Sequence, residues 1–267
     1  MRETLTRLLS GIVYILLLAA AIFYSPESFL LLFGIFLLIA VVEFSNLVQL
    51  PKLIPIAIAI AGYFLFAFFP STSYTLHLLL LATLFVSARC VAFLFSDARP
   101  RLDVLSKYVY LIGYIILPFI LLTKIPFQEG FYDQKVIFSI FMLIWINDTF
   151  AFIVGKTMGQ NKLYEKISPK KTIEGFIGGV GFAVLASAVI SRYYIFQDLY
   201  VWVTIAFIIG VIGTIGDLVE SKFKRLAGVK DSGNIMPGHG GILDRLDSVI
   251  FAAPFVFLFY QILYYVS

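Results

Sequence analysis

The chain has 267 residues, of which 61% are hydrophobic, 17% aromatic and only 13% charged, and its formal net charge is +4. Since about a quarter of the residues in a soluble domain are charged, this composition and a mean hydropathy of +0.97 exclude a soluble globular protein and indicate an integral membrane protein. We expect no nucleic acid partner, because no basic tract is interleaved with aromatic residues.

Long apolar segments with few helix breakers favour membrane-spanning helices over a β-barrel. Because a helix needs about 20 mostly apolar residues to cross the bilayer, we predict an all-α, polytopic membrane protein with about nine transmembrane helices. The predicted spans are residues 8–24, 28–44, 53–69, 76–95, 108–123, 136–154, 176–196, 199–217 and 248–266. The first resembles a signal peptide in its basic start, but its long apolar run favours an uncleaved helix.

The two halves of the chain differ in polarity. Residues 1–125, with about five of the predicted spans, show mainly hydrophobic character. Residues 126–267 contain two long polar loops, at 155–175 and 218–247. We therefore expect one compact helical domain whose functional groups lie in its C-terminal half.

The distribution of Lys and Arg predicts the orientation in the membrane. With the N-terminus in the cytoplasm, only Lys124, Lys135 and Arg192 of the 20 Lys and Arg residues fall on the outer side. The positive-inside rule therefore predicts this orientation, and we expect a multi-pass protein of the cytoplasmic (inner) cell membrane. Both long polar loops then face the cytoplasm.

An acidic residue occurs inside the sixth predicted span. Asp148 follows Asn147 in the stretch "MLIWINDTFAFIVG". An ionised side chain at the bilayer centre costs a few kcal/mol, so a structural or functional role must explain Asp148. A polar side chain hydrogen-bonded between helices would explain Asp148 taken alone.

The loop at 155–175 contains the stretch "SPKKTIEGFIGG", which leads into the seventh predicted span. Its adjacent cations, Lys170 and Lys171, stand just before the helix. Lysines in this position either bind phosphate or simply follow the positive-inside rule. The residues alone leave both interpretations open.

The eighth predicted span ends in "GTIGDLVESKFKR". Its polar residues are spaced so that they share one helix face. They are Asp217, Glu220, Ser221, Lys224 and Arg225. An ion-paired helix end explains the bases, but it does not explain Asp217, which lies within the apolar run.

The last polar stretch, "KDSGNIMPGHGGILDRLD", occupies residues 230–247. Its glycines permit close backbone approach, and their amides could face an anion, although a plain glycine turn is the commoner reason for such a pattern. Asp244 and Asp247 lie at the entrance of the last span, where the helix dipole also favours acids.

Four aspartates thus lie near the cytoplasmic ends of their predicted spans. Carboxylates converging in a low dielectric would repel one another, and some would protonate, unless a cation held them. Mg²⁺ is commonly bound by one or two carboxylates together with substrate phosphates, whereas Cys and His are too scarce here for a zinc site. With lysines and glycines nearby, the pattern predicts metal-dependent phosphate chemistry at the cytoplasmic membrane surface.

The stretch "SKFKRLAGVKDSGNIMPGHGGILDRLDS", residues 221–248, resembles the signature of the phosphatidate cytidylyltransferase family, also called CDP-diacylglycerol synthases. Two further stretches, "NDTFAFIVGKTMG" and "SPKKTIEG", agree with it, so the resemblance covers most of residues 147–248. One departure is Phe152, where the family pattern has Tyr, which puts a hydroxyl role there in doubt. The resemblance implies transfer of CMP from CTP to phosphatidic acid, giving CDP-diacylglycerol and pyrophosphate for phospholipid biosynthesis.

Under this resemblance, residues 126–267 form the catalytic transmembrane region, with Mg²⁺ as cofactor and a paired centre with K⁺ as a variant. The implied metal ligands are Asp217, Asp244, Asp247 and Asp148. The catalytic set is Asp217, Asp244, Asp247, Lys171 and His239. The substrate-binding set is Ser168, Lys170, Lys171, Ser221, Lys224, Arg225, Lys230, Asp231, Gly240, Gly241 and Arg245.

The chemistry of the residues fits this transfer. The phosphate monoester of phosphatidic acid is largely ionised near neutral pH, so it needs no strong general base. Positioning and charge stabilisation then dominate, and His239 is better cast as an orienting or phosphate-contacting group than as a proton acceptor. The expected partners are CTP, phosphatidic acid and the lipid bilayer, and a homodimer is compatible with the sequence.

Two other functions stay open at this stage. A CTP-dependent lipid alcohol kinase of the dolichol or phytol type would use similar acidic helices, but it would transfer the γ-phosphate to a hydroxyl. An ion-coupled transporter would use intramembrane acids, but it would place them near the membrane midplane and show repeat symmetry. In this sequence the acids lie near one membrane face, and no internal repeat is evident.

Overall fold

The computed structural model describes residues 2–96, 102–128 and 130–266. Helices dominate these residues and run in the order α1 Arg2–Tyr24, α2 Pro26–Val48, α3 Leu53–Phe68, α4 Ser73–Phe95, α5 Val104–Tyr110, η1 Leu111–Ile116, α6 Leu117–Lys124, α7 Gln134–Met158, α8 Ile173–Ile190, η2 Ser191–Ile195, α9 Leu199–Leu226 and α10 Leu243–Val266. The elements η1 and η2 are π-helical; η1 joins α5 to α6, and η2 continues α8.

Two short antiparallel hairpins accompany the helices. The strands β1 Phe127–Gln128 and β2 Phe131–Tyr132 form one, and β3 Lys162–Tyr164 and β4 Ser168–Thr172 form the other. The second hairpin occupies most of the predicted loop at 155–175. The all-α fold class is therefore confirmed, with local strands only in connections.

Within the described residues, seven helical segments are long and apolar enough to cross a membrane. They are Pro26–Val48, Ser73–Phe95, Val104–Lys124, Gln134–Met158, Ile173–Ile195, Leu199–Leu226 and Leu243–Tyr264. Two shorter apolar helices, Leu8–Tyr24 and Leu53–Phe68, match the first and third predicted spans. The prediction of a polytopic membrane protein is confirmed, whereas the count of nine spans is not.

The helix boundaries near the polar loops differ from the predicted ones. Helix α9 continues to Leu226, well beyond the predicted end at residue 217, because Lys224 pairs with Glu220 one turn earlier. Helix α10 begins at Leu243 rather than at residue 248. The polar loop is therefore residues 227–242, which we call the glycine-rich loop, and the acidic residues on either side of it are helical.

Glycines allow α8 to pack closely against α7, and α9 to pack closely against α10. A Cβ atom at Gly175 would lie 2.7 Å from the carbonyl oxygen of Ala151, and one at Gly179 would lie 2.7 Å from that of Asn147. On α9, a Cβ atom at Gly216 would lie 2.4 Å from the Cβ of Phe251 on α10. Small residues at such contacts let helix backbones approach inside a membrane, and here they fix how far apart the polar side chains of these helices lie.

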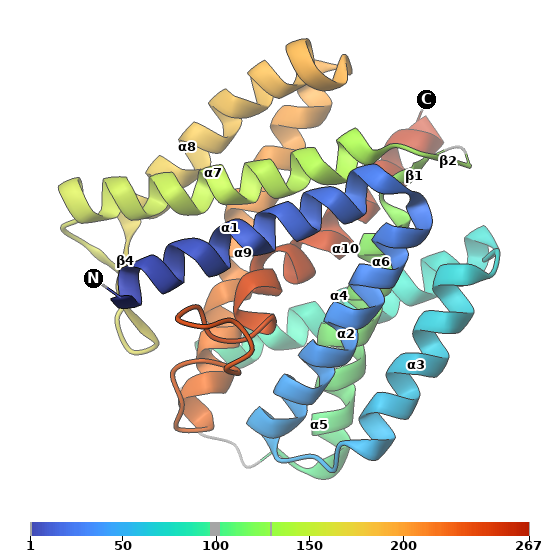
Figure 1. Cartoon of the computed structure of the whole chain (residues 1–267), viewed down its shortest axis with the longest axis horizontal. Coiled ribbons are helices and arrows are strands. Elements are labelled where there is room, and N and C mark those ends of the chain that lie inside the picture. The colour runs from blue at the N-terminus through green and yellow to red at the C-terminus, as the bar shows by residue number, and fades with distance from the viewer. Residues whose placement is uncertain (1, 97–101, 129, 267) are drawn as a thin grey trace.

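The polar connections gather at one end of the molecule (Figure 1). The N-terminus, strand β4 and the glycine-rich loop lie toward the same end, while the C-terminus lies beside the β1–β2 hairpin at the other end. The hydroxyl of Ser10 on α1 donates to the carbonyl of Pro237 in the glycine-rich loop at 3.0 Å. The first helix thus contacts the loop that the sequence places more than two hundred residues later.

Candidate metal and phosphate site

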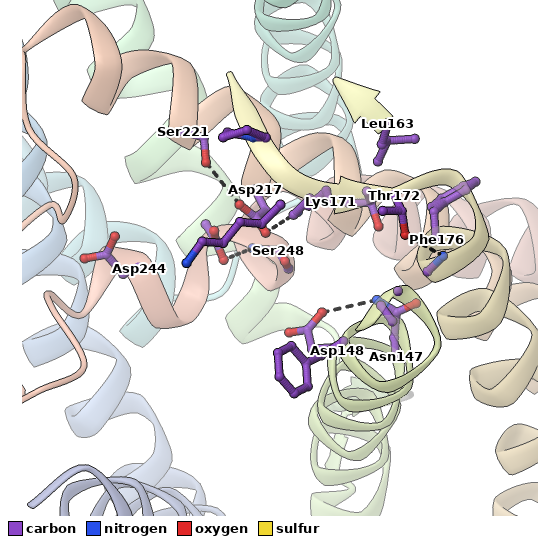
Figure 2. Close-up of a pocket in the computed structure, with 18 of the residues that line it drawn as sticks. Asn147, Asp148, Leu163, Lys171, Thr172, Phe176, Asp217, Ser221, Asp244 and Ser248 are labelled. Atoms are coloured by element: carbon purple, nitrogen blue, oxygen red, sulfur yellow. Dashed lines mark hydrogen bonds and ion pairs between the residues drawn. The ribbon is translucent and has the colours of Figure 1, made fainter. Parts of the chain in front are cut away.

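A pocket of about 750 Å³ opens between α7, the β3–β4 hairpin, α9 and α10. Figure 2 shows Asp148 on α7 and the pair Lys171 and Asp217 facing this space from different elements. Most of the residues predicted from the sequence line it. They are Asp148, Lys170, Lys171, Asp217, Ser221, Lys224, Arg225, Lys230, Asp231, Asp244, Arg245 and Asp247.

Three carboxylates form a tight cluster at this pocket. Asp217 and Glu220 on α9 and Asp247 on α10 each place one oxygen within 4.8 Å of the others. The close approach of α9 to α10 at Gly216 brings them together, since a Cβ atom there would lie 2.9 Å from the backbone carbonyl of Asp247. Glu220 is fully buried and Asp247 is 8% exposed, so the charges have little solvent to screen them.

The cluster has the properties of a cation site. Among the described residues, the Oε1 atom of Glu220 is buried with no hydrogen-bond partner, and buried polar groups are normally paired. Carboxylate oxygens are the ligands that hard divalent cations prefer. A cation among Asp217, Glu220 and Asp247 would supply the missing partner and offset the repulsion between their charges.

The sequence analysis placed Glu220 on the polar face of its helix but did not include it among the metal ligands. Its spacing of three residues from Asp217 places both on one face of α9, and that spacing was the available signal. The sequence could not show that Asp247 would meet them from another helix. The predicted metal ligands Asp217 and Asp247 belong to the cluster of three, while Asp148 and Asp244 stand next to it in the same pocket.

Asp244 is held by donors from the protein. Its Oδ1 atom accepts from the ammonium of Lys224 at 2.6 Å. Its Oδ2 atom accepts from the backbone N–H and the hydroxyl of Ser232 at 2.8 and 2.9 Å and from the N–H of Gly241 at 2.8 Å. Asp244 therefore ties two separate points of the glycine-rich loop to the start of α10.

Asp148 lines the pocket from α7. The side-chain amide of Asn147 donates to Asp148 Oδ1 at 3.2 Å. Asn147 lies at the junction of three helices, because a Cβ atom added at Gly179 or at Gly210 would come within 2.9 or 3.2 Å of its Oδ1 atom. The packing of α7, α8 and α9 thus determines where Asp148 points.

The β3–β4 hairpin brings lysines to the pocket. Lys171 forms an ion pair with Asp217, which also accepts from the hydroxyl of Ser221 at 3.3 Å. The hairpin is held in place by Glu174 at the start of α8, whose carboxylate accepts from the N–H of Gln160 at 3.1 Å and from the side-chain amide of Asn161 at 2.7 Å.

The pocket is lined by more cations than the sequence indicated. Lys156 at the end of α7 and Lys162 on β3 line it together with the predicted basic residues. Eight Lys and Arg side chains among the lining residues thus surround the carboxylates. Such a mixture suits a highly charged anion that binds together with a metal ion.

His239 lies beside the main pocket. A second, smaller pocket of about 520 Å³ is lined by His239 and Gly240, and it shares Lys230, Asp231 and Arg245 with the first. The Nδ1 atom of His239 lies 2.7 Å from the hydroxyl of Ser10. Its carbonyl accepts from the guanidinium of Arg245 at 2.9 Å. In this arrangement His239 connects the glycine-rich loop to α1 and to Arg245.

Two other predicted residues lie outside the lining of both pockets. Ser168 pairs with Tyr164 in the β3–β4 hairpin. The N–H of Gly241 donates to Asp244, so the anion it faces is a carboxylate of the protein. Gly240 has a φ of +87°, a conformation that favours glycine.

A buried glutamate from the N-terminal half also reaches this region. Glu43 on α2 accepts hydrogen bonds from the N–H groups of Ile242 and Leu243, at the start of α10. The sequence analysis did not single it out. The available signal was a charged residue within the apolar run "LLIAVVEFSNLV", the same signal that identified Asp148.

Comparison with known proteins identifies relatives of this chain and the family to which it belongs. It aligns with proteins named phosphatidate cytidylyltransferase from Staphylococcus aureus (strain COL), at 51% identity over 116 residues, and from Staphylococcus haemolyticus (strain JCSC1435), at 49% over 116 residues. Each alignment covers 43% of this chain and 44% of the relative, so it spans less than half the length of either protein. The model of the cytidylyltransferase family matches residues 5–263, and the chain therefore belongs to the cytidylyltransferase family.

Proposed function

We propose that the protein is a phosphatidate cytidylyltransferase, a nucleotidyltransferase that transfers CMP from CTP to phosphatidic acid. Its products are CDP-diacylglycerol, which serves phospholipid biosynthesis, and pyrophosphate. The observation that carries this proposal is the cluster of Asp217, Glu220 and Asp247 at a pocket lined with cations, at the polar end of a membrane protein. Membership of the cytidylyltransferase family supports the same reaction.

The proposed cofactor is Mg²⁺, held by Asp217, Glu220 and Asp247. When bound, it would orient the phosphates and neutralise the charge that develops during the displacement. A paired centre with K⁺ is the variant that the resemblance implies, and Asp148 and Asp244 are the neighbouring carboxylates for it. The unpartnered oxygen of Glu220 supports the presence of a cation.

The chain's own cations would align the two substrates. The phosphate of phosphatidic acid is ionised near neutral pH, and one of its oxygens attacks the α-phosphorus of CTP. The bond from that phosphorus to the bridging oxygen breaks, and pyrophosphate leaves with the electron pair. Lys171, beside Asp217, would meet phosphate at the carboxylate cluster, and the other lining cations would bind the remaining negative charge.

His239 fits an orienting role in this reaction. Its carbonyl binds Arg245, which lines both pockets, and its ring contacts Ser10. Since the nucleophile is already ionised, no group has to remove a proton from it. We therefore assign His239 to holding the glycine-rich loop and Arg245 in place.

The pocket also has a side suited to the lipid. Phe152, which lines the pocket from α7, is 67% exposed, and Ile177 on the neighbouring helix α8 is 62% exposed. Exposed apolar side chains on spanning helices face the acyl chains of the bilayer. Phosphatidic acid could keep its chains there while CTP enters from the water. Because residue 152 is Phe, this side offers no hydroxyl at that position.

The proposal includes a location and an assembly. The protein is a multi-pass membrane protein, and we place it in the cytoplasmic membrane with the β3–β4 hairpin and the glycine-rich loop on the cytoplasmic side. The charge distribution supports this orientation. A homodimer stays a prediction, to be measured from the mass of the purified protein in detergent.

The position of the transferred label tests the reaction. Purified protein in phosphatidate-containing micelles is given CTP labelled at either the α- or the γ-phosphorus. Only the α-label enters the lipid fraction if CMP is transferred. Entry of the γ-label instead identifies a CTP-dependent lipid kinase. In a separate assay with proteoliposomes, solute uptake without nucleotide turnover identifies a transporter.

A further inference from the structure

We propose that Glu43, on helix α2 of the N-terminal half, is a positioning residue for the carboxylate cluster. It holds the first turn of α10 and one end of the glycine-rich loop in place, so that Asp247 meets Asp217 and Glu220. This inference rests on the metal site of the proposed function. It gives a specific task to a part of the chain that resembles only a hydrophobic anchor.

The carboxylate of Glu43 is fully engaged by this region. Its Oε1 atom accepts from the N–H of Ile242 at 3.1 Å, and its Oε2 atom accepts from the N–H of Leu243 at 2.8 Å. The hydroxyl of Ser232 donates to Oε2 at 3.2 Å. Glu43 itself is 3% exposed. A buried carboxylate is tolerated when such donors satisfy it, and here all three come from the glycine-rich loop and α10.

The position of these donors explains why a carboxylate is suited to the task. The first backbone N–H groups of a helix have no partner within the helix, and a negative charge is favoured near them by the helix dipole. Side chains close to the helix start in the sequence usually supply this cap. In this protein a separate helix supplies it for α10.

The loop closes around Glu43 without spare room. A Cβ atom at Gly233 would lie 2.3 Å from Glu43 Oε1, and a Cβ atom at Gly241 would lie 2.4 Å from it. Glycine is therefore needed at these two positions of the loop to let the backbone reach the carboxylate. The glycines that the sequence suggested for binding an anion surround a carboxylate of the chain itself.

Hydrogen bonds and ion pairs connect Glu43 to the carboxylate cluster. The hydroxyl of Ser232 lies 3.2 Å from Glu43 Oε2 and 2.9 Å from Asp244 Oδ2, so the two carboxylates share its single proton, and the backbone N–H of Ser232 donates to Asp244 as well. Asp244 binds Lys224, and Lys224 binds Glu220 of the cluster. Loss of the Glu43 cap would therefore loosen the first turn of α10, which carries Asp244 and is followed directly by Asp247.

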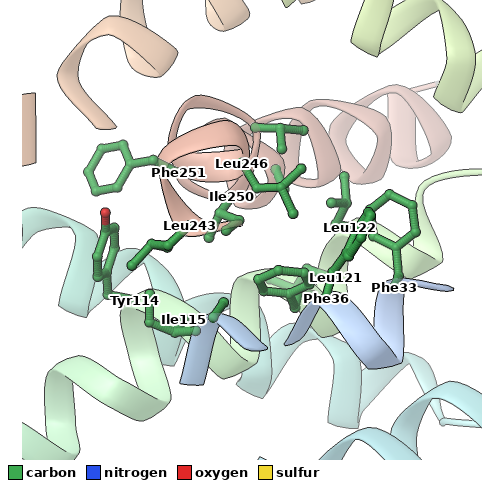
Figure 3. Packing of buried hydrophobic residues seen from close by; sticks show 14 of the residues in the cluster. Phe33, Phe36, Tyr114, Ile115, Leu121, Leu122, Leu243, Leu246, Ile250 and Phe251 are labelled. Atoms are coloured by element: carbon green, nitrogen blue, oxygen red, sulfur yellow. The ribbon is translucent and has the colours of Figure 1, made fainter. Parts of the chain in front are cut away.

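Apolar side chains pack helix α2, which carries Glu43, against α10. Figure 3 shows Phe33 and Phe36 of α2 in the same buried cluster as Leu243 and Leu246 of α10. These contacts hold the two helices together independently of Glu43. Substitution of the carboxylate should consequently leave the fold intact and change the local position of α10. Glu43 lines neither of the two pockets described above, so it acts through other residues.

The test uses Glu43→Gln in the protein purified in detergent. Glutamine keeps the size of the side chain, but its NH₂ group cannot accept from a backbone N–H. The melting temperature is followed during a titration with Mg²⁺ alone, without substrates. We expect the half-maximal Mg²⁺ concentration to rise about tenfold, the size of effect seen for residues that orient metal ligands. CMP transfer should fall by a similar factor and recover in part with excess Mg²⁺.

Val41→Ala is the matched control, because Val41 is a fully buried residue on the same helix that contributes only packing. It should lower the melting temperature and leave the Mg²⁺ midpoint unchanged. Glu43→Asp, which keeps the charge, should have a half-maximal Mg²⁺ concentration between those of the wild type and Glu43→Gln. If Glu43→Gln lowers the melting temperature but keeps the wild-type Mg²⁺ midpoint, Glu43 is a structural cap only and the proposal is wrong.

Two further measurements keep the test decisive. If Glu43→Gln yields no folded protein, Ser232→Ala removes the shared hydroxyl and should shift the Mg²⁺ midpoint in the same direction; an unchanged midpoint overturns the proposal. The Mg²⁺ titration does not depend on turnover. If the wild-type protein binds Mg²⁺ but transfers no CMP, the proposed function fails while the role of Glu43 can still be judged.

Discussion

The ammonium of Lys224 on α9 lies 2.6 Å from the carboxylate of Asp244 on α10. The same ammonium also pairs with Glu220 one turn earlier on α9. The three side chains are at most 10% exposed. Lys224 therefore joins the carboxylate cluster to Asp244, the residue that anchors the glycine-rich loop, and it connects the two helices that carry the candidate site.

Lys224→Met should destabilise the protein strongly. It leaves two buried carboxylates without their partner, and breaking a buried ion pair from one side costs about 3–5 kcal/mol. The double variant Lys224→Met/Glu220→Gln removes one of the orphaned charges and should recover part of the loss. Thermal unfolding in detergent measures both. Equal stability of the wild type and the single variant would contradict the assigned role of this ion pair.

Lys171→Ala should weaken substrate binding more than folding. The side chain of Lys171 is 28% exposed and lies in the pocket against Asp217, so its charge is available to a substrate phosphate. We expect a higher KM for CTP or for phosphatidic acid, with a nearly unchanged melting temperature. Lys52→Ala, an exposed lysine that lines neither pocket, is the control. Wild-type kinetics of Lys171→Ala would remove this residue from the site.

Gly179→Ala should separate α7 from α8. The added methyl group would lie 2.7 Å from the carbonyl oxygen of Asn147, and overpacking of this kind typically costs about 1–3 kcal/mol. Gly181→Ala on the same helix is the matched control, because nothing lies within 4 Å of its Cβ position. Melting temperatures of the two variants should differ clearly. Identical values would show that the close α7–α8 contact contributes nothing to stability.

Removal of the metal should destabilise the folded protein. Without a cation, the charges of Asp217, Glu220 and Asp247 repel one another at a site where two of the three are buried. Dialysis against EDTA should lower the melting temperature, and Mg²⁺ at about 100 times its Kd should restore about 2.7 kcal/mol. The response should be weaker in Asp247→Asn. A melting temperature that changes neither on dialysis against EDTA nor on addition of Mg²⁺ would argue against a cation in this cluster.

The sequence predicted the helices well because hydropathy determines which segments can lie in a bilayer. It predicted the end of α9 poorly for a related reason. Hydropathy falls at residue 217, where the charged residues begin, but the helix continues because Lys224 pairs with Glu220 within it. A boundary set by side-chain pairing cannot be located from apolar content alone.

The carboxylates were predictable as a group and not as individual ligands. The energetic argument against unpaired charges in a membrane identified Asp148, Asp217, Asp244 and Asp247, which all line one pocket. Which of them meet depends on helix rotation and crossing, which contacts such as Gly216 against Phe251 determine. The same argument applied to the first half of the chain would have identified Glu43.

The central claim is that a cation held by Asp217, Glu220 and Asp247 serves the transfer of CMP to a membrane lipid. Its most direct test is the rate at which α-labelled CTP labels phosphatidate, measured against Mg²⁺ concentration for the wild type, Asp217→Asn and Asp247→Asn. We predict Mg²⁺-dependent labelling by the wild type and a loss of at least about 100-fold in each variant, with all three proteins folded. Wild-type rates and an unchanged Mg²⁺ dependence in both variants would contradict the claim.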